Sequence, residues 1–150
     1  MWLRAKSFKL LGFVASISLL LTSCASQVEY APCGVVAAFK NPAGEDSYYR
    51  AVVTHLNGMP VISRPYYILP VGEYEFTLAE LISAPQLKVS LSARGTKTVT
   101  VIVEDDTRYH LAAKFKTDKI YAGKNSDYWQ AVVWQQESYQ CEASSQLVGN

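Results

Sequence analysis

The stretch from residue 73 to residue 81 alternates between polar and apolar side chains, and this pattern restricts the fold more than any other feature. The apolar positions are Tyr74, Phe76 and Leu78, and the positions between them hold glutamate or threonine. Successive side chains of a β-strand point to opposite faces, so the stretch predicts a strand with one buried and one solvated face. The alternative is a short helix over residues 78–83, because Ala, Glu and Leu favour helices.

Further segments of this kind follow along the chain, separated by turn signals. They are rich in β-branched and aromatic residues and cover 35–39, 48–56, 61–62, 66–69, 87–91, 99–103, 109–115 and 128–135. The turn signals are Asn57-Gly58, Pro70-Val71-Gly72, Arg94-Gly95 and Glu104-Asp105-Asp106. Many short strands at such spacing are typical of an antiparallel sandwich. The sequence therefore predicts an all-β fold, an antiparallel β-sandwich of about seven to eight short strands.

The first 23 residues have the layout of a signal peptide that is removed by cleavage. Three basic residues lie within positions 1–9, and positions 10–21 are apolar or small and uncharged. This stretch is too short for a transmembrane helix, which needs about 20 apolar residues. Leu21-Thr22-Ser23-Cys24 resembles the lipobox of bacterial lipoproteins, in which cleavage occurs just before the cysteine. The alternative is an ordinary secretory signal that is cleaved after Ala25.

The resemblance to lipoproteins implies a covalent lipid on Cys24. In that family the thiol takes a diacylglycerol and the new α-amino group is acylated, as with palmitate, and two or more acyl chains hold a protein stably on a membrane. Ala25 stands where an Asp would favour the inner membrane, so we expect the periplasmic side of the outer membrane. Residues 24–32 then form a lipidated tether that spans at most about 30 Å.

The chain contains three cysteines. With Cys24 assigned to lipid, Cys33 and Cys141 are left as a pair in an oxidising compartment, where disulfides form. A bridge between them would enclose about 108 residues, and loop entropy makes it worth roughly 4.7 kcal/mol. The alternative is two buried free thiols. The pair delimits the predicted β-sandwich domain, residues 33–141, and residues 142–150 are expected to form a frayed tail.

Part of the predicted domain resembles small envelope β-sandwiches. The Asn57-Gly58 turn, the stretch from Leu69 to Tyr74 and the strand from Tyr109 to Ala113 are similar to the PEGA-like and transthyretin-like domains of envelope proteins. The likeness covers about half of the chain and rests on turn chemistry. It implies an Ig-like or transthyretin-like sandwich, and a likeness of fold implies no particular activity.

Charge and motifs disfavour nucleic-acid binding, metal binding and catalysis. From Cys24 onward the chain carries 11 basic and 13 acidic residues, whereas nucleic acid favours a basic surface. His55 and His110 have no second ligand at a near spacing, and Glu104-Asp105-Asp106 lacks the alternating acids of a calcium loop. The sequence holds no Gly-x-Ser-x-Gly elbow and no phosphate-binding glycine loop. We expect a protein that is not an enzyme and has no metal and no cofactor beyond the lipid.

Aromatic residues are the one excess that suggests a function. The chain has ten tyrosines and three tryptophans, several in adjacent pairs. Because neighbours on a strand point to opposite faces, one member of each pair should lie outside the core. The candidate ligand-facing aromatics are Tyr48, Tyr66, Trp129 and Trp134; their alternative role is to supply β-propensity and protect strand edges.

Together these features predict a membrane-anchored envelope lipoprotein with a stapled β-sandwich. We expect it to act as a non-catalytic binding or scaffolding module with an envelope protein as partner. The second hypothesis is a carbohydrate- or peptidoglycan-binding module that uses the outward aromatics, and the third is an envelope hydrolase. The short tether favours a membrane-protein partner, because it keeps the domain close to the bilayer.

Overall fold

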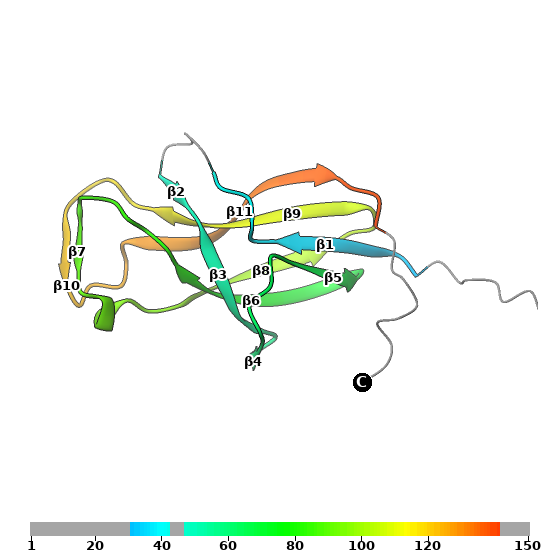
Figure 1. The fold of residues 1–150 in the computed structure, drawn as a ribbon, viewed down its shortest axis with the longest axis horizontal. Coiled ribbons are helices and arrows are strands. Elements are labelled where there is room, and N and C mark those ends of the chain that lie inside the picture. Colours follow the sequence, from blue (N-terminus) through cyan, green and yellow to red (C-terminus); the bar gives the residue numbers. More distant parts are fainter. Residues whose placement is uncertain (1–30, 43–46, 142–150) are drawn as a thin grey trace, which may run out of the picture.

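The computed structural model describes residues 31–42 and 47–141 as a β-sandwich (Figure 1). The predicted all-β fold is confirmed. Seven strands have five or more residues: β1 (Cys33–Ala37), β3 (Ala51–Leu56), β5 (Tyr66–Pro70), β6 (Gly72–Glu80), β8 (Lys97–Val103), β9 (Thr107–Phe115) and β11 (Trp129–Ser138). Four short strands complete the sheets: β2 (Tyr48–Tyr49), β4 (Met59–Pro60), β7 (Leu87–Val89) and β10 (Tyr121–Gly123). Among the described residues, no helix is long and apolar enough to cross a membrane.

Two sheets form the layers of the sandwich. One has the strand order β11-β9-β1-β5, with β2 also paired to β9, and the other has the order β4-β3-β6-β8. A small sheet of β7 and β10 extends the molecule at one end (Figure 1). Most pairings are antiparallel, as predicted, but β1 pairs with β9 and β10 pairs with β7 in parallel. Parallel neighbours are joined by long connections between distant segments. The alternation within one strand does not indicate which distant segment pairs with it.

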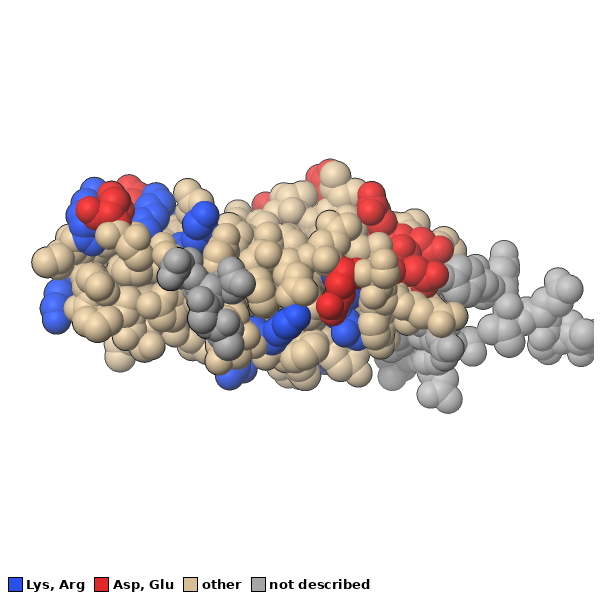
Figure 2. Space-filling view, turned by 90° about the horizontal axis from the view of Figure 1, so that it is seen from above, with Lys and Arg blue, Asp and Glu red and all other residues tan. Residues whose placement is uncertain are grey.

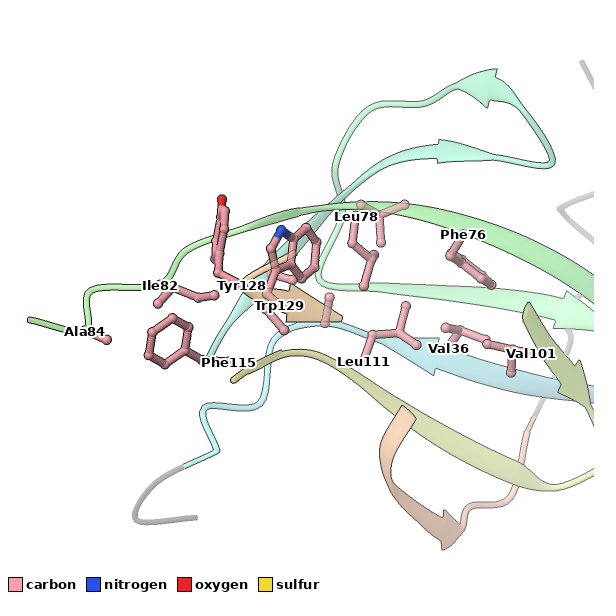
Figure 3. Close-up of a cluster of buried hydrophobic side chains, with 14 of the residues drawn as sticks. Val36, Phe76, Leu78, Ile82, Ala84, Val101, Leu111, Phe115, Tyr128 and Trp129 are labelled. Carbon is pink, nitrogen blue, oxygen red and sulfur yellow. The ribbon is translucent and has the colours of Figure 1, made fainter. Parts of the chain in front are cut away.

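The core fills the space between the two sheets (Figure 3). The predicted apolar side of β6 supplies Phe76 and Leu78, which have no exposed surface. The helix considered for residues 78–83 does not form, because β6 continues to Glu80 and pairs there with β3. Leu91, expected in a strand, instead begins the 3-10 helix Leu91–Ala93 and is 80% exposed.

Three of the four predicted turns connect consecutive strands, whereas Arg94, predicted in a turn, has an extended backbone after the 3-10 helix. Asn57 and Gly58 have φ angles of 49° and 75° and connect β3 to β4, as expected of a tight hairpin. The acidic turn, defined as Glu104, Asp105 and Asp106, carries the chain from β8 in one sheet to β9 in the other. This turn lies so close to β1 that a Cβ added at Gly34 would stand 2.5 Å from the Glu104 carbonyl oxygen.

The disulfide predicted between Cys33 and Cys141 is present, with the two Cα atoms 5.7 Å apart. The acidic turn holds the backbone on both sides of it. Asp105 Oδ1 accepts a hydrogen bond from the Cys33 N–H (3.0 Å), and Asp106 Oδ1 accepts one from the Cys141 N–H (2.8 Å). Two of the three adjacent acids considered as a calcium loop, Asp105 and Asp106, therefore bind the backbone at the disulfide.

Candidate functional site

The outer face of the five-stranded sheet collects most of the side chains that could contact a partner. On β9 the odd-numbered residues from Tyr109 to Phe115 enter the core, so the even-numbered residues Arg108, His110 and Lys114 point away from it. Residues opposite each other in a sheet share a face. Through this register β1, β5 and β11 add their own outward side chains to the same surface.

Four rings form a cluster on this outer face, here called the aromatic cluster: Phe39, Tyr48, His110 and Trp134. The rings of Phe39 and His110 meet edge to face with centroids 5.8 Å apart. His110 lies 6.1 Å from Trp134, and Trp134 lies 6.3 Å from Tyr48. The contacts join β9, β11, β2 and the segment after β1, four stretches that are distant in sequence.

Two lysines lie against the aromatic cluster. Lys40 Nζ stands 5.5 Å from the centroid of the Trp134 ring and donates a hydrogen bond of 2.7 Å to Gln135 Oε1. Lys114 Nζ stands 5.5 Å from the centroid of the Tyr48 ring. Cations at this distance from a ring face are attracted by its negative charge density. The cluster therefore presents aromatic rings with positive charge beside them.

A polar group stands next to the cluster. His110 is only 1% exposed, and its Nε2 lies 2.8 Å from Glu137 Oε1; because a carboxylate oxygen accepts, the ring is the donor of this hydrogen bond. Arg108 contacts the same oxygen at 3.4 Å and lies over the Tyr139 ring at 3.4 Å. The hydrogen bond from His110 is the largest cause that lowers the pKa of Glu137 below its ordinary value. The carboxylate is therefore kept charged, bound to two neighbours of its own sheet.

Three polar atoms around this group are enclosed and have no hydrogen-bond partner among the described residues. They are His110 Nδ1, Arg108 Nε and Trp134 Nε1. Enclosed polar groups without a partner cost free energy. A fourth such atom, Trp129 Nε1, lies in the core. The outer face therefore contains polar side-chain atoms whose hydrogen-bonding capacity the described residues leave unfilled.

The aromatics predicted to face a ligand divide between the surface and the core. Tyr66, which lies opposite Ala37 in the register and is 50% exposed, and the half-buried Tyr48 and Trp134 belong to the outer face. Trp129 does not, and its prediction as a ligand-facing residue is wrong. It is 1% exposed and lies in the core beside the equally enclosed Tyr128 (Figure 3). Tyr128 precedes the first residue of β11, so the strand rule of alternating faces does not separate the two rings.

Sequence reasoning missed several residues of the outer face. The sequence did not indicate Phe39, Lys40 or Lys114 as residues of a contact surface, and His110 was considered only as a metal ligand. The alternation of β9 could have placed His110 and Lys114 on one face, but nothing local links them to Trp134. The lipid-anchor prediction at Cys24, with the signal peptide, most of the tether and the tail at 142–150, lies outside the described residues.

A second buried polar group lies in the core and also escaped sequence reasoning. Glu80, 8% exposed, accepts a hydrogen bond of 2.8 Å from the Tyr128 hydroxyl and pairs with Arg94 at 3.4 Å. Burial, followed by the bond to Glu80, raises the pKa of Tyr128, which therefore stays protonated. Every partner belongs to the fold itself, so the group stabilises the structure.

The described residues contain no group of three or more His, Cys, Asp or Glu side chains placed to hold a metal ion. His55 bonds through Nδ1 to its neighbour Thr54 Oγ1 at 3.0 Å. No protein-family model, no curated protein and no solved structure matches the chain.

Proposed function

We propose that this chain is a membrane-anchored envelope lipoprotein that acts as a non-catalytic binding or scaffolding module, with the outer face of its five-stranded sheet as the contact surface. The observation that carries the proposal is the aromatic cluster itself. Its four rings contact one another with two lysines beside them, and two enclosed ring nitrogens, His110 Nδ1 and Trp134 Nε1, have no hydrogen-bond partner among the described residues. The disulfide is bonded to β1 of the same sheet. A rigid surface of this kind loses little conformational freedom on binding.

The position of β1 supports anchoring through Cys24. The strand begins at Cys33, where the disulfide and the acidic turn tie the backbone down, and β11 ends at the same end of the elongated domain (Figure 1). A tether of residues 24–32 reaches at most about 30 Å. A lipid on Cys24 would hold this end near the bilayer, with β7 and β10 at the other end.

The geometry of the rings favours a protein partner over a sugar. A sugar stacks on a ring face that is open and flat, whereas the rings here meet at interplanar angles of 36° to 77°. Lysine ammonium groups already stand over the rings of Trp134 and Tyr48. Aromatic side chains are enriched at the centres of protein interfaces.

A carbohydrate-binding module is the second candidate, because Tyr66 is 50% exposed and Phe39 is 45% exposed on the same face. Pelleting of the purified chain with cell-wall sacculi distinguishes the two. Binding that Tyr66→Ala and Phe39→Ala abolish would favour the glycan, and absence of pelleting would exclude it.

Affinity capture from crosslinked membranes tests the contact surface. We expect Phe39→Ala combined with Tyr66→Ala to reduce recovery of the partner at least tenfold. Met59→Ala combined with Ile62→Ala is the matched control, because these apolar residues are 69% and 79% exposed outside the outer face. If the control variant loses the same proteins, or if the outer-face variant loses none, the proposed contact surface is wrong.

Membrane fractionation of a Cys24→Ala variant tests the anchor separately. The wild-type chain should fractionate with membranes and label with a radioactive acyl chain, and the variant should do neither. Unchanged acyl labelling in the variant would refute lipidation at this position, whatever the result of the capture experiment.

A further inference from the structure

Strand β8 lies at an edge of the four-stranded sheet. It pairs with β6 along its whole length from Lys97 to Val103 without a register shift, and among the described residues no strand pairs with its other side. Its outward side chains are Thr98, Thr100 and Ile102, and Ile102 is 65% exposed. An edge of this type leaves backbone N–H and C=O groups available to another strand.

The other edge strands of the described sheets each carry a feature that blocks such pairing. Strand β5 begins after Pro65 and ends at Pro70, and β4 has only two residues, one of them Pro60. Strand β11 contains a register shift, and β2, β7 and β10 have only two or three residues each. Proline, bulges and shortness are the devices by which proteins prevent edge-to-edge association. Strand β8 has none of them, and no charge between Thr98 and Val103.

Space is available along the side of β8 that faces β11. Two clefts lie there, with volumes of about 380 Å³ and 360 Å³. The first is lined by Lys97 and Thr98 of β8, and the second by Thr100, Val101 and Ile102. The groove therefore follows β8 over most of its length, and residues of β11 such as Gln130 and Val133 form its opposite wall.

The distribution of charge indicates what pairs with this edge. Residues 81–103 carry two lysines and one arginine but no acidic residue, and residues 116–128 carry three lysines and two aspartates. These segments build the end with β7 and β10, where Figure 2 shows several blue atoms with a few red ones, whereas the acidic turn lies at the opposite end. Strand β8 runs from the basic end at Lys97 to the acidic end at Glu104.

We propose that β8 pairs antiparallel with β8 of a second copy of this chain, which joins two four-stranded sheets into one. In this arrangement the basic end of each copy lies beside the acidic end of the other, and opposite charges attract at both ends of the pair. A parallel arrangement would instead place like charges together. The contact uses the sheet edge and leaves the outer face of the other sheet open, so it does not depend on the function proposed above.

Two anchored copies impose a further condition on this dimer. Antiparallel pairing places the two Cys33 ends at opposite ends of the assembly. Both tethers reach one membrane when the dimer lies along the bilayer, since each tether spans at most about 30 Å.

The test is the mass of the full chain in detergent, measured by sedimentation. We expect a dimer for the wild type, and a dissociation constant raised roughly tenfold or more in Thr100→Lys combined with Ile102→Lys, because like charges then meet across the new pairing. Leu91→Lys combined with Ile62→Lys is the matched control, at positions that are 80% and 79% exposed away from β8. Circular dichroism shows whether each variant keeps its β structure.

A crosslink in intact membranes gives a second reading that detergent cannot affect. Thr100→Cys should form a covalent dimer that reductant reverses, and Leu91→Cys should not. A monomeric wild type, or a dimer that is unchanged by the lysine pair on β8, would overturn the proposal. Equal weakening by the control pair would also overturn it, because the charge rather than the edge would then be responsible.

Discussion

Replacing both Cys33 and Cys141 by alanine should cost this domain a large part of its stability. The two residues are 2% and 1% exposed, and the bond closes a loop with a sequence separation of 108 residues. In the folded state the acidic turn already holds both backbones, so their positions should change little without the bond. The main effect is on the unfolded chain, which gains the freedom that the bond removes.

The size of this effect follows from the loop length. The chain-entropy model gives roughly 4.7 kcal/mol at 25 °C for a loop of this size. Domains of this size have total unfolding free energies of about 5–15 kcal/mol. The loss is therefore nearly the whole unfolding free energy at the lower end of that range and about a third of it at the upper end.

Urea unfolding of a soluble version that lacks residues 1–24 measures the loss. The double alanine variant should lose roughly 3–5 kcal/mol, and its m-value should rise because its unfolded state is more expanded. Reduced wild type is the matched control, since it has the same unfolded topology with the sulfur atoms retained, and it should lose the same amount within about 1 kcal/mol. A loss below about 1 kcal/mol in both would refute the loop-entropy reasoning. A loss in the alanine variant alone would assign the effect to packing.

Three further predictions address the core, the contact between Gly34 and the acidic turn, and the outer face. Trp129→Ala should cost about 3–5 kcal/mol in urea unfolding, and Tyr66→Ala less than about 1 kcal/mol, because only the first ring is enclosed. Equal costs would contradict the assignment of Trp129 to the core. Gly34→Ala should destabilise by at least about 1–3 kcal/mol, whereas Gly95→Ala, with no atom within 4 Å of the added Cβ, should be nearly neutral. The pKa of Glu137 is lowered in the fold, so its stabilisation should be complete above its ordinary value of 4.5 and lost as the pH falls through the folded value. The stability difference between wild type and Glu137→Gln should therefore shrink in acid, and a difference that grew there would contradict the hydrogen-bond assignment.

The local alternation of side chains was enough to predict much of the fold. Strands β6, β8 and β9 lie close to their predicted positions, with the predicted apolar residues in the core. Period-two alternation is a property of neighbouring residues, and burial of one face follows from it directly. The Asn57-Gly58 turn was predictable for the same reason, because both residues tolerate positive φ. The cysteine pair followed from counting three cysteines and assigning one to lipid.

The candidate site was predicted only in part. Tyr48, Tyr66 and Trp134 were correctly expected away from the core, since each lies in or beside a strand whose other neighbour packs inward. Their assembly into one surface depends on pairings between distant segments, above all β9 with β11 and β2. No local pattern encodes such pairings, and therefore none indicated that His110 and two lysines join the rings.

The sequence by itself determined the class of fold, the longer strands, three of the turns and the two cysteines that could be bonded. All of these depend on residues near one another in the chain or on simple counting. The tertiary structure alone decided that Trp129 is enclosed, that Glu80 is buried with Tyr128 and Arg94, and that β8 is an edge without protection. The reason is physical: the environment of a side chain depends on the distant segments that pack against it. Which segments these are depends on the fold of the whole chain.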